Sequence, residues 1–162
     1  MDASTTTVGY AFVDGKDIVT MGFIPIQKEK TIREKVQLTM ETLTELDPFN
    51  EVDKIYIEDS LSGFLHGRTS QQTIIKLAKF NAVLTYCLEF AYGEIVDGVN
   101  PMTARKQLFG KARKQGVTAI DFVKEEINCL YNIEEYVKLT KTGLWDKRNM
   151  DAYDALVCAL YE

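Results

Sequence analysis

The sequence predicts an α/β fold in which helices flank a mixed sheet. Short apolar runs rich in β-branched residues alternate with segments of helical periodicity through the middle of the chain. The run Ile55–Phe64 (IYIEDSLSGF) places Glu58 at the end of one such strand and then breaks into Ser and Gly. The predicted element order is β-β-α-β-α-β-α-α-α, and this alternation is typical of a sheet covered by helices.

The first two strands form a predicted β-hairpin. Val8–Val13 and Ile18–Ile24 are both rich in β-branched and aromatic residues, and the pair Asp14-Gly15 between them is a turn signal. Pro25 ends the second strand because proline cannot donate to a strand ladder.

The remaining elements follow from periodicity and capping residues. Thr31 is an expected N-cap and Glu34 completes a capping box, so a helix is predicted to start there. In chain order we expect helix Thr31–Leu46 (ended by Asp47-Pro48), strand Lys54–Glu58, helix Ser70–Tyr92, strand Glu94–Val99, a short helix between Pro101 and Gly110, helix Thr118–Tyr131, a loop over Lys138–Asn149, and helix Met150–Tyr161.

Length and composition indicate one folded domain spanning residues 1–162. The chain is 46% hydrophobic, which is enough to build a core, and it carries neither a long apolar run nor a basic-then-apolar leader. A soluble, cytoplasmic protein with no membrane partner is therefore expected. Three cysteines, Cys87, Cys129 and Cys158, are widely spaced in apolar surroundings, so we expect free core thiols.

Charge is unevenly distributed along the chain. The net charge is −5, yet the segment Pro101–Gly116 holds Arg105, Lys106, Lys111, Arg113 and Lys114 without one acid. By itself such a run is best interpreted as a solvated helix face. Beside an acidic metal site it becomes a candidate track for a phosphate backbone.

Acids recur at three separated places. Asp2 precedes the hairpin, Glu58 ends a strand, and Asp151 and Asp154 are three residues apart, so they share one helix face. Each has an ordinary alternative: a solvated terminus, a turn residue, or an acid that complements the helix dipole. Together they predict one site with oxygen ligands, which hard divalent cations prefer.

Three segments carry a resemblance to a known family. These are DASTTTVGYAFVD at the start, IYIED in the middle and DAYDALVCAL at the end. In this order and spacing they resemble the RuvC-type Holliday junction resolvases of the RNase H-like superfamily, in their small phage or bacterial style. The resemblance covers nearly the whole chain.

The resemblance implies a metal-dependent endonuclease that resolves four-way DNA junctions by paired nicks. It implies an RNase H-like mixed five-stranded sheet, a homodimer, a bacterial or phage-infected cell, and two Mg²⁺ ions, with Mn²⁺ as the alternative. The acids carried over are Asp2, Glu58, Asp151 and Asp154. Lys114, in KARKQGV, occupies the family's lysine position, where it would contact the scissile phosphate or offset its charge.

The loop after Glu58 departs from the family pattern. The family places an aromatic residue three positions after its glutamate, and this chain has Leu61 there. Phe64 either stacks on opened bases in its place or packs on the long helix. Arg68 is expected to contact DNA, and His66 is treated as incidental.

Two other functions stay open at this stage. One is a related nuclease that acts on flaps, branched DNA or structured RNA, because the acids fix the chemistry but not the substrate's shape. The other is an inactive module that only binds nucleic acid or a partner protein. An actin-like ATPase fragment is excluded, because 162 residues cannot form two such lobes.

The start of the chain predicts an incomplete first strand. A central strand needs about five residues, whereas one residue, Met1, precedes Asp2. We therefore expect a truncated first strand, a gap between the hairpin and the Glu58 strand, and a full-length protein with more apolar residues upstream.

Overall fold

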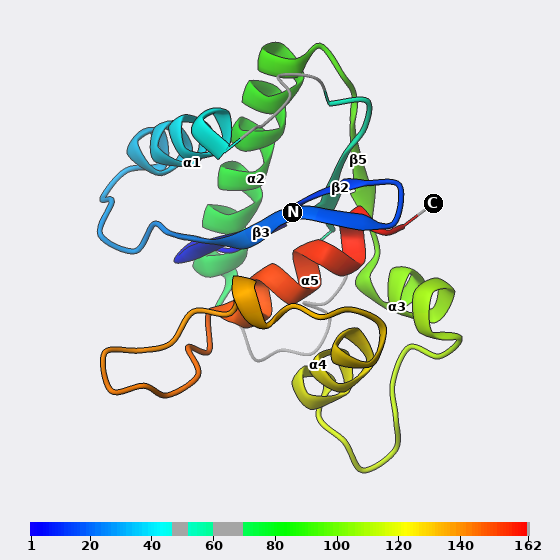
Figure 1. Cartoon of the computed structure of the whole chain (residues 1–162). Coiled ribbons are helices and arrows are strands. Elements are labelled where there is room, and N and C mark those ends of the chain that lie inside the picture. The colour runs from blue at the N-terminus through cyan, green and yellow to red at the C-terminus, as the bar shows by residue number, and fades with distance from the viewer. Residues whose placement is uncertain (47–51, 60–69, 162) are drawn as a thin grey trace.

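The structure is a computed structural model, and it describes residues 1–46, 52–59 and 70–161. Leu61, Phe64, His66 and Arg68, as well as Asp47 and Pro48, lie outside these residues. The elements, shown in Figure 1, are β1 (Asp2–Ala3), β2 (Thr7–Asp14), β3 (Asp17–Pro25), α1 (Ile32–Leu46), β4 (Ile55–Glu58), α2 (Gln71–Tyr92), β5 (Val96–Val99), α3 (Pro101–Phe109), α4 (Ala119–Leu130), the 3₁₀ turn η2 (Glu134–Tyr136) and α5 (Asn149–Ala159).

The predicted hairpin is confirmed. β2 and β3 pair antiparallel from Thr7 opposite Pro25 to Asp14 opposite Asp17, with a register shift after Phe12. Gly15 takes a φ of +59° in the turn, a conformation that side chains with a Cβ rarely adopt.

The five-stranded sheet expected from the resemblance is divided in two by strand pairing. β1, β2 and β3 form one antiparallel sheet, and β4 and β5 form a separate parallel pair. Two hydrogen bonds join the sheets: the Met1 amine donates to Tyr56 O (2.6 Å), and Glu58 N–H donates to Met1 O (2.8 Å). Asp2 lies opposite Gly9 on the other side. Met1 and Asp2 therefore span the place where the sequence predicted a gap.

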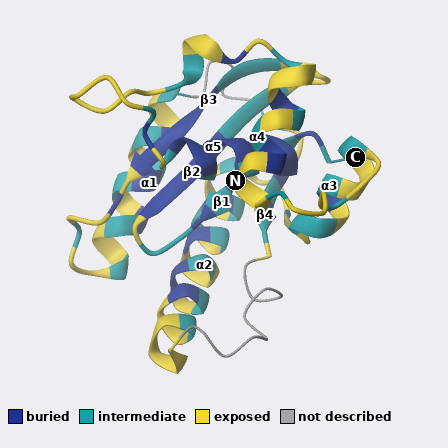
Figure 2. Cartoon of the chain, turned by 90° about the horizontal axis from the view of Figure 1, so that it is seen from below, coloured by how far each residue is buried: buried dark blue, intermediate teal, exposed yellow. Residues whose placement is uncertain are grey.

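Helices cover both faces of the strands (Figures 1 and 2). On one face Val8, Ile55 and Ile57 pack with α1 and α2. On the opposite face Val13 and Tyr56 pack with residues of α3, α4 and α5. Because side chains alternate between the two faces of a strand, each strand contributes to two cores.

The last helix, α5, is the most deeply enclosed. Its buried side chains run from Asn149 to Cys158, and the helix packs across β2, β3 and β4. The segment before it, expected to be a loop, contains a short hairpin in which Leu139 pairs with Trp145. The Asn149 amide closes that hairpin by accepting from Lys138 N–H (3.0 Å) and donating to Lys138 O (2.8 Å).

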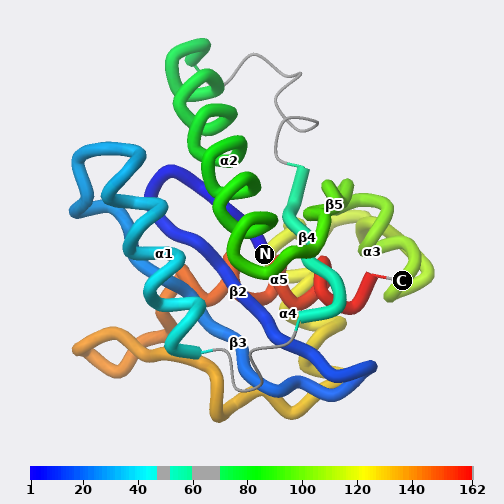
Figure 3. The backbone as a smooth tube through the Cα atoms, turned by 90° about the horizontal axis from the view of Figure 1, so that it is seen from above, coloured from blue at the N-terminus to red at the C-terminus, as the bar shows by residue number. Residues whose placement is uncertain are grey.

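The predicted capping box and the predicted helix ends are present. Glu34 accepts from Thr31 N–H (2.9 Å) and donates its own N–H to the Thr31 hydroxyl (3.2 Å), which is the expected capping box. Ser70 caps the long helix α2, seen end to end in Figure 3, and Gly110 ends α3 with a φ of 73°.

The prediction of three core thiols is wrong at one position. All three cysteines are free, and Cys158 is buried, but Cys129 is exposed on α4 and Cys87 is half-buried. The apolar residues around Cys129 in the sequence include Leu130, which is itself exposed. Across the described residues, no helix is both long and apolar enough to cross a membrane.

Candidate metal centre

Strand alternation places Asp2 on the face of the sheet that α5 covers. Met1 and Ala3 are buried in the core beneath α1 and α2. Asp2 lies between them on β1, so its side chain points to the opposite face. Its strand partner is Gly9 of β2.

The same alternation orients Glu58. Ile55 and Ile57 of β4 are buried in the core beneath α1 and α2, so Tyr56 and Glu58 face α5. The hydrogen bond from Glu58 N–H to Met1 O fixes the end of β4 beside β1. Asp2 and Glu58 therefore lie next to each other although they are 56 residues apart in the sequence.

α5 brings the third carboxylate. One carboxylate oxygen each from Asp2, Glu58 and Asp154 lie within 4.8 Å of one another. Asp151 lies one turn earlier on α5 and is not in this three-carboxylate group, but its charge raises the pKa of both Asp2 and Glu58. The four acids predicted from sequence are therefore brought into one region, with three of them converging. We call Asp2, Glu58 and Asp154 the acidic triad.

Burial raises the pKa of every one of these acids, and repulsion from neighbouring carboxylates adds to it at Asp2, Glu58 and Asp151. Burial is the largest cause in each case, and it raises the pKa of Glu58 to about 7 and of Asp151 to about 6. Asp2 is raised well above its usual range by burial and then by the charges of Glu58, Asp154 and Asp151. Burial also raises the pKa of Asp154, against the charge of Arg105. Clustered carboxylates that are poorly solvated need a cation or a proton.

The donor set fits a hard divalent cation. All three triad ligands are carboxylate oxygens, which Mg²⁺, Mn²⁺ and Ca²⁺ prefer. With ligand distances of roughly 2.0–2.6 Å, such an ion can contact oxygens that are about 4–5 Å apart. The triad's spacing of 4.8 Å or less lies at that limit, so one ion can touch all three after a small closure.

Two lysines of the basic run form ion pairs with glutamates of α4. Lys114 Nζ lies 3.0 Å from Glu125 Oε2, and Lys111 Nζ lies 2.8 Å from Glu126 Oε1. Lys106 and Arg113 are exposed, and no ion pair joins either to another described residue. The basic run therefore pairs partly with the acidic segment that follows it. Its contact with DNA, and the catalytic role of Lys114, stay predictions.

Arg105 occupies a different place from the other basic residues. Its guanidinium Nη2 donates to Asp154 Oδ1 at 2.8 Å, and its side chain is 12% exposed. From sequence it was assigned to the phosphate track. The structure joins it to the acidic triad, a role that nothing in the spacing of the basic run indicated.

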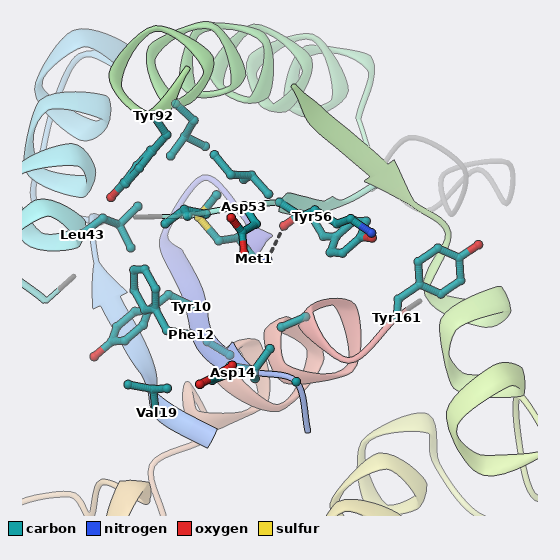
Figure 4. Close-up of a pocket in the computed structure, with 18 residues that line it drawn as sticks. Met1, Tyr10, Phe12, Asp14, Val19, Leu43, Asp53, Tyr56, Tyr92 and Tyr161 are labelled. Carbon is teal, nitrogen blue, oxygen red and sulfur yellow. Dashed lines mark hydrogen bonds between the residues drawn. The ribbon is translucent and has the colours of Figure 1, made fainter. Parts of the chain in front are cut away.

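A cavity of about 550 Å³ opens elsewhere on the molecule, and Figure 4 shows it. Tyr10, Phe12, Leu43 and Tyr92 line it, together with Met1 and Tyr56, which are joined by the hydrogen bond from the Met1 amine. None of the four candidate acids lines it. The carboxylates, not this cavity, make the candidate site.

Comparison with solved structures gives the fold. The chain superposes on a structure of RuvC from Thermus thermophilus with a TM-score of 0.61, over 99% of this chain and 89% of that one. The fold is RuvC-like. The two sequences are 17% identical. No protein-family model and no curated protein sequence matches the chain.

Proposed function

We propose that this protein is a metal-dependent endonuclease that resolves four-way DNA junctions. The observation that carries the proposal is the convergence of the half-buried side chains of Asp2, Glu58 and Asp154 within 4.8 Å on a RuvC-like fold. Clustered, poorly solvated carboxylates that offer only oxygen ligands are suited to Mg²⁺ or Mn²⁺. The RuvC-like fold supports the junction as substrate, together with the sequence resemblance.

In this proposal the chain's own groups have separate roles. Asp2, Glu58 and Asp154 would hold the cations, with Asp151 beside them to complete a two-ion site. Two bound Mg²⁺ ions would activate a water and stabilise the leaving oxygen of the phosphodiester. Lys114, once released from Glu125, offsets charge at the scissile phosphate. Lys106, Lys111 and Arg113 contact the phosphate backbone.

A homodimer is part of the same proposal, because paired nicks need two sites related by a two-fold axis. Apolar side chains on α2 support it: Tyr86 is 67% and Phe90 83% exposed, and their rings stack at 6.4 Å. Ile75 and Val83 are also exposed on this helix. Sedimentation that finds only monomer at micromolar concentration, with and without junction DNA, would contradict the dimer.

The deciding experiment is cleavage of a labelled four-way junction with both nicks mapped. We expect paired, symmetric nicks with Mg²⁺ or Mn²⁺ and none in EDTA. Flap, hybrid and branched substrates run in parallel separate the junction resolvase from a related nuclease of different specificity. Metal titration without DNA separates both nucleases from an inactive binding module, since such a module is expected to bind no metal pair.

A further inference from the structure

The Arg105–Asp154 ion pair is unusual among the ion pairs of the described residues because both partners are largely enclosed. The side chains are 12% and 18% exposed, whereas those of Lys114 and Glu125 are 45% and 52% exposed. α3 supplies the arginine and α5 the aspartate, and the two helices pack together. An enclosed charge is costly unless an opposite charge accompanies it. Each charge of the pair therefore stabilises the other in this enclosed position.

The guanidinium acts on more than its direct partner. Its charge lowers the pKa of Asp154 and also that of Glu58, in both cases against the larger effect of burial. The other cation acting on Glu58 is the Met1 amine, whose own pKa is lowered by burial. Arg105 is thus the side chain whose positive charge compensates Asp154 and Glu58 within the acidic triad.

The guanidinium is not fully satisfied where it lies. One contact to Asp154, through Nη2, holds it, and its Nε is buried without a hydrogen-bond partner among the described residues. A bidentate arginine–carboxylate pair would use two parallel N–H groups. A single contact with a buried, unpaired donor beside it is a weaker anchor, because an unmade buried hydrogen bond is costly.

We propose that Arg105 is the internal counter-ion of the acidic triad in the metal-free protein, and that a divalent cation competes with its guanidinium for the Asp154 carboxylate. The inference rests on the proposed metal site and adds to it a positioning residue on α3. Two positive charges beside the same carboxylates repel each other. Metal affinity is therefore set partly by the displacement of Arg105. When metal is absent, the contact with Arg105 holds the Asp154 carboxylate in place.

The test measures Mn²⁺ binding by calorimetry, without DNA and at one fixed pH near 8, for the full chain and for Arg105→Gln. We expect the variant to bind Mn²⁺ at least about tenfold more tightly than wild type, a change of about 1.4 kcal/mol. In EDTA the variant should melt at a lower temperature, and Mn²⁺ should raise its melting temperature by more than that of wild type. Arg105→Lys, which keeps the charge, should bind with an affinity close to that of wild type.

Arg33→Gln is the matched control, because Arg33 is exposed on α1, on the opposite face of the sheet. It removes the same charge and should leave Mn²⁺ affinity unchanged. Equal or weaker Mn²⁺ binding by Arg105→Gln would overturn the counter-ion role while leaving the metal site intact. Wild type that binds no Mn²⁺ at millimolar concentration would overturn the proposed function itself.

A measurement on wild type keeps the inference testable if Arg105→Gln does not fold. The Arg105 Nε–H resonance can be followed by NMR while diamagnetic Mg²⁺ is titrated into the protein. Displacement of the guanidinium predicts a saturating shift of this resonance with the same Mg²⁺ dependence as binding. A resonance that stays unchanged at saturation would contradict displacement.

Discussion

Gly9 of β2 lies directly against the backbone of Asp151 in α5. A Cβ added at position 9 would be 1.8 Å from Asp151 O and 2.1 Å from Asp151 C, which is far inside van der Waals contact. Gly9 is also the strand partner of Asp2. The absence of a side chain at this one position therefore lets α5 approach the sheet closely enough for Asp154 to meet Asp2 and Glu58.

Gly9→Ala should destabilise the protein and open the acidic triad together. The atoms in the way belong to the backbone, so α5 must move, and overpacking of this kind costs about 3 kcal/mol or more. For a chain of this length that corresponds to a fall in melting temperature of roughly 10 °C. Metal affinity should fall with it, because Asp154 moves away from the strand-borne acids.

Gly98→Ala is the matched control for this change. Gly98 is also a strand glycine, but among the described residues a Cβ there would meet only Asp59 Cβ, at an ordinary 3.9 Å. It should leave the melting temperature within about 2 °C of wild type. If Gly9→Ala melts at the same temperature as Gly98→Ala, the close approach of α5 is not needed for stability.

The acids were predictable from sequence because they stand in recognisable segments: Asp2 before the hairpin, Glu58 at the end of a β-branched run, and Asp151 with Asp154 on one helix face. The order and spacing of these segments carry the resemblance. Strand runs and helical spacing are local patterns that can be identified without the fold. The hairpin and the capped helices were found for the same reason.

The features that were not predicted from the sequence depend on contacts between elements that are distant along the chain. Arg105 belongs to a basic run, and only the packing of α3 against α5 joins it to Asp154. The division of the sheet also escaped prediction, because β1 has two residues and strand periodicity needs a longer run. Gly9 carried a usable signal: an isolated glycine inside a strand often marks a close backbone approach.

Glu58→Gln and Asp151→Asn should each abolish junction cleavage while leaving binding intact or tighter. Either change removes a negative charge near the phosphate, and Glu58→Gln also removes a metal ligand of the triad. Cleavage and gel-shift assays on the same junction separate the two effects. Asp97→Asn, at an exposed position of β5, is the control and should cleave normally. Wild-type turnover in Glu58→Gln or Asp151→Asn would remove that residue from the site.

Neutralising Lys106, Lys111 and Arg113 together should weaken junction binding and flatten its salt dependence. Each lost phosphate contact lowers the slope of log K against log salt by roughly one. Because Lys111 is paired with Glu126, Lys106→Ala with Arg113→Ala should account for most of the loss. An unchanged salt slope in the triple variant would make the run a solvated helix face.

Lys114→Ala should slow the chemical step more than it weakens binding, measured in single-turnover cleavage. Glu125→Gln gives a complementary variant, because it releases Lys114 from its ion pair without changing the lysine. The release should leave cleavage equal to or faster than wild type. Lys114→Ala with an unchanged single-turnover rate would show that the lysine has no catalytic role.

Asn149→Ala should loosen the hairpin that precedes α5. The amide makes two hydrogen bonds to Lys138 and is buried, so its loss leaves the Lys138 N–H without its partner. A cost of about 1–3 kcal/mol is expected, measured by urea unfolding. Asn149→Asp can accept from the Lys138 N–H but cannot donate to the Lys138 carbonyl, so its unfolding free energy should lie between those of wild type and Asn149→Ala. Equal stability of Asn149→Ala and wild type would mean that the hairpin is held by other contacts.

The pH dependence of metal-free stability should reveal the raised pKa of Glu58. Burial, followed by the charge of Asp154, raises this pKa from 4.5 to about 7. Between these values the folded chain binds a proton that the unfolded chain releases. The stabilisation from this proton is therefore complete below about pH 4.5 and is lost as the pH rises through about 7. At 1.36 kcal/mol per pKa unit the loss is on the order of 3 kcal/mol.

Glu58→Gln isolates this contribution because glutamine does not titrate. In EDTA, we expect the difference in unfolding free energy, wild type minus Glu58→Gln, to decrease as the pH rises from 5 to 8. Glu45→Gln, at an exposed position of α1, controls for the loss of a carboxylate. Over the same interval the Mg²⁺ affinity of wild type should rise, because the ligands must be deprotonated to bind. Stability and metal affinity thus respond to pH in opposite directions. A wild-type minus Glu58→Gln difference that is constant from pH 5 to pH 8 would place Glu58 in water rather than among the buried acids.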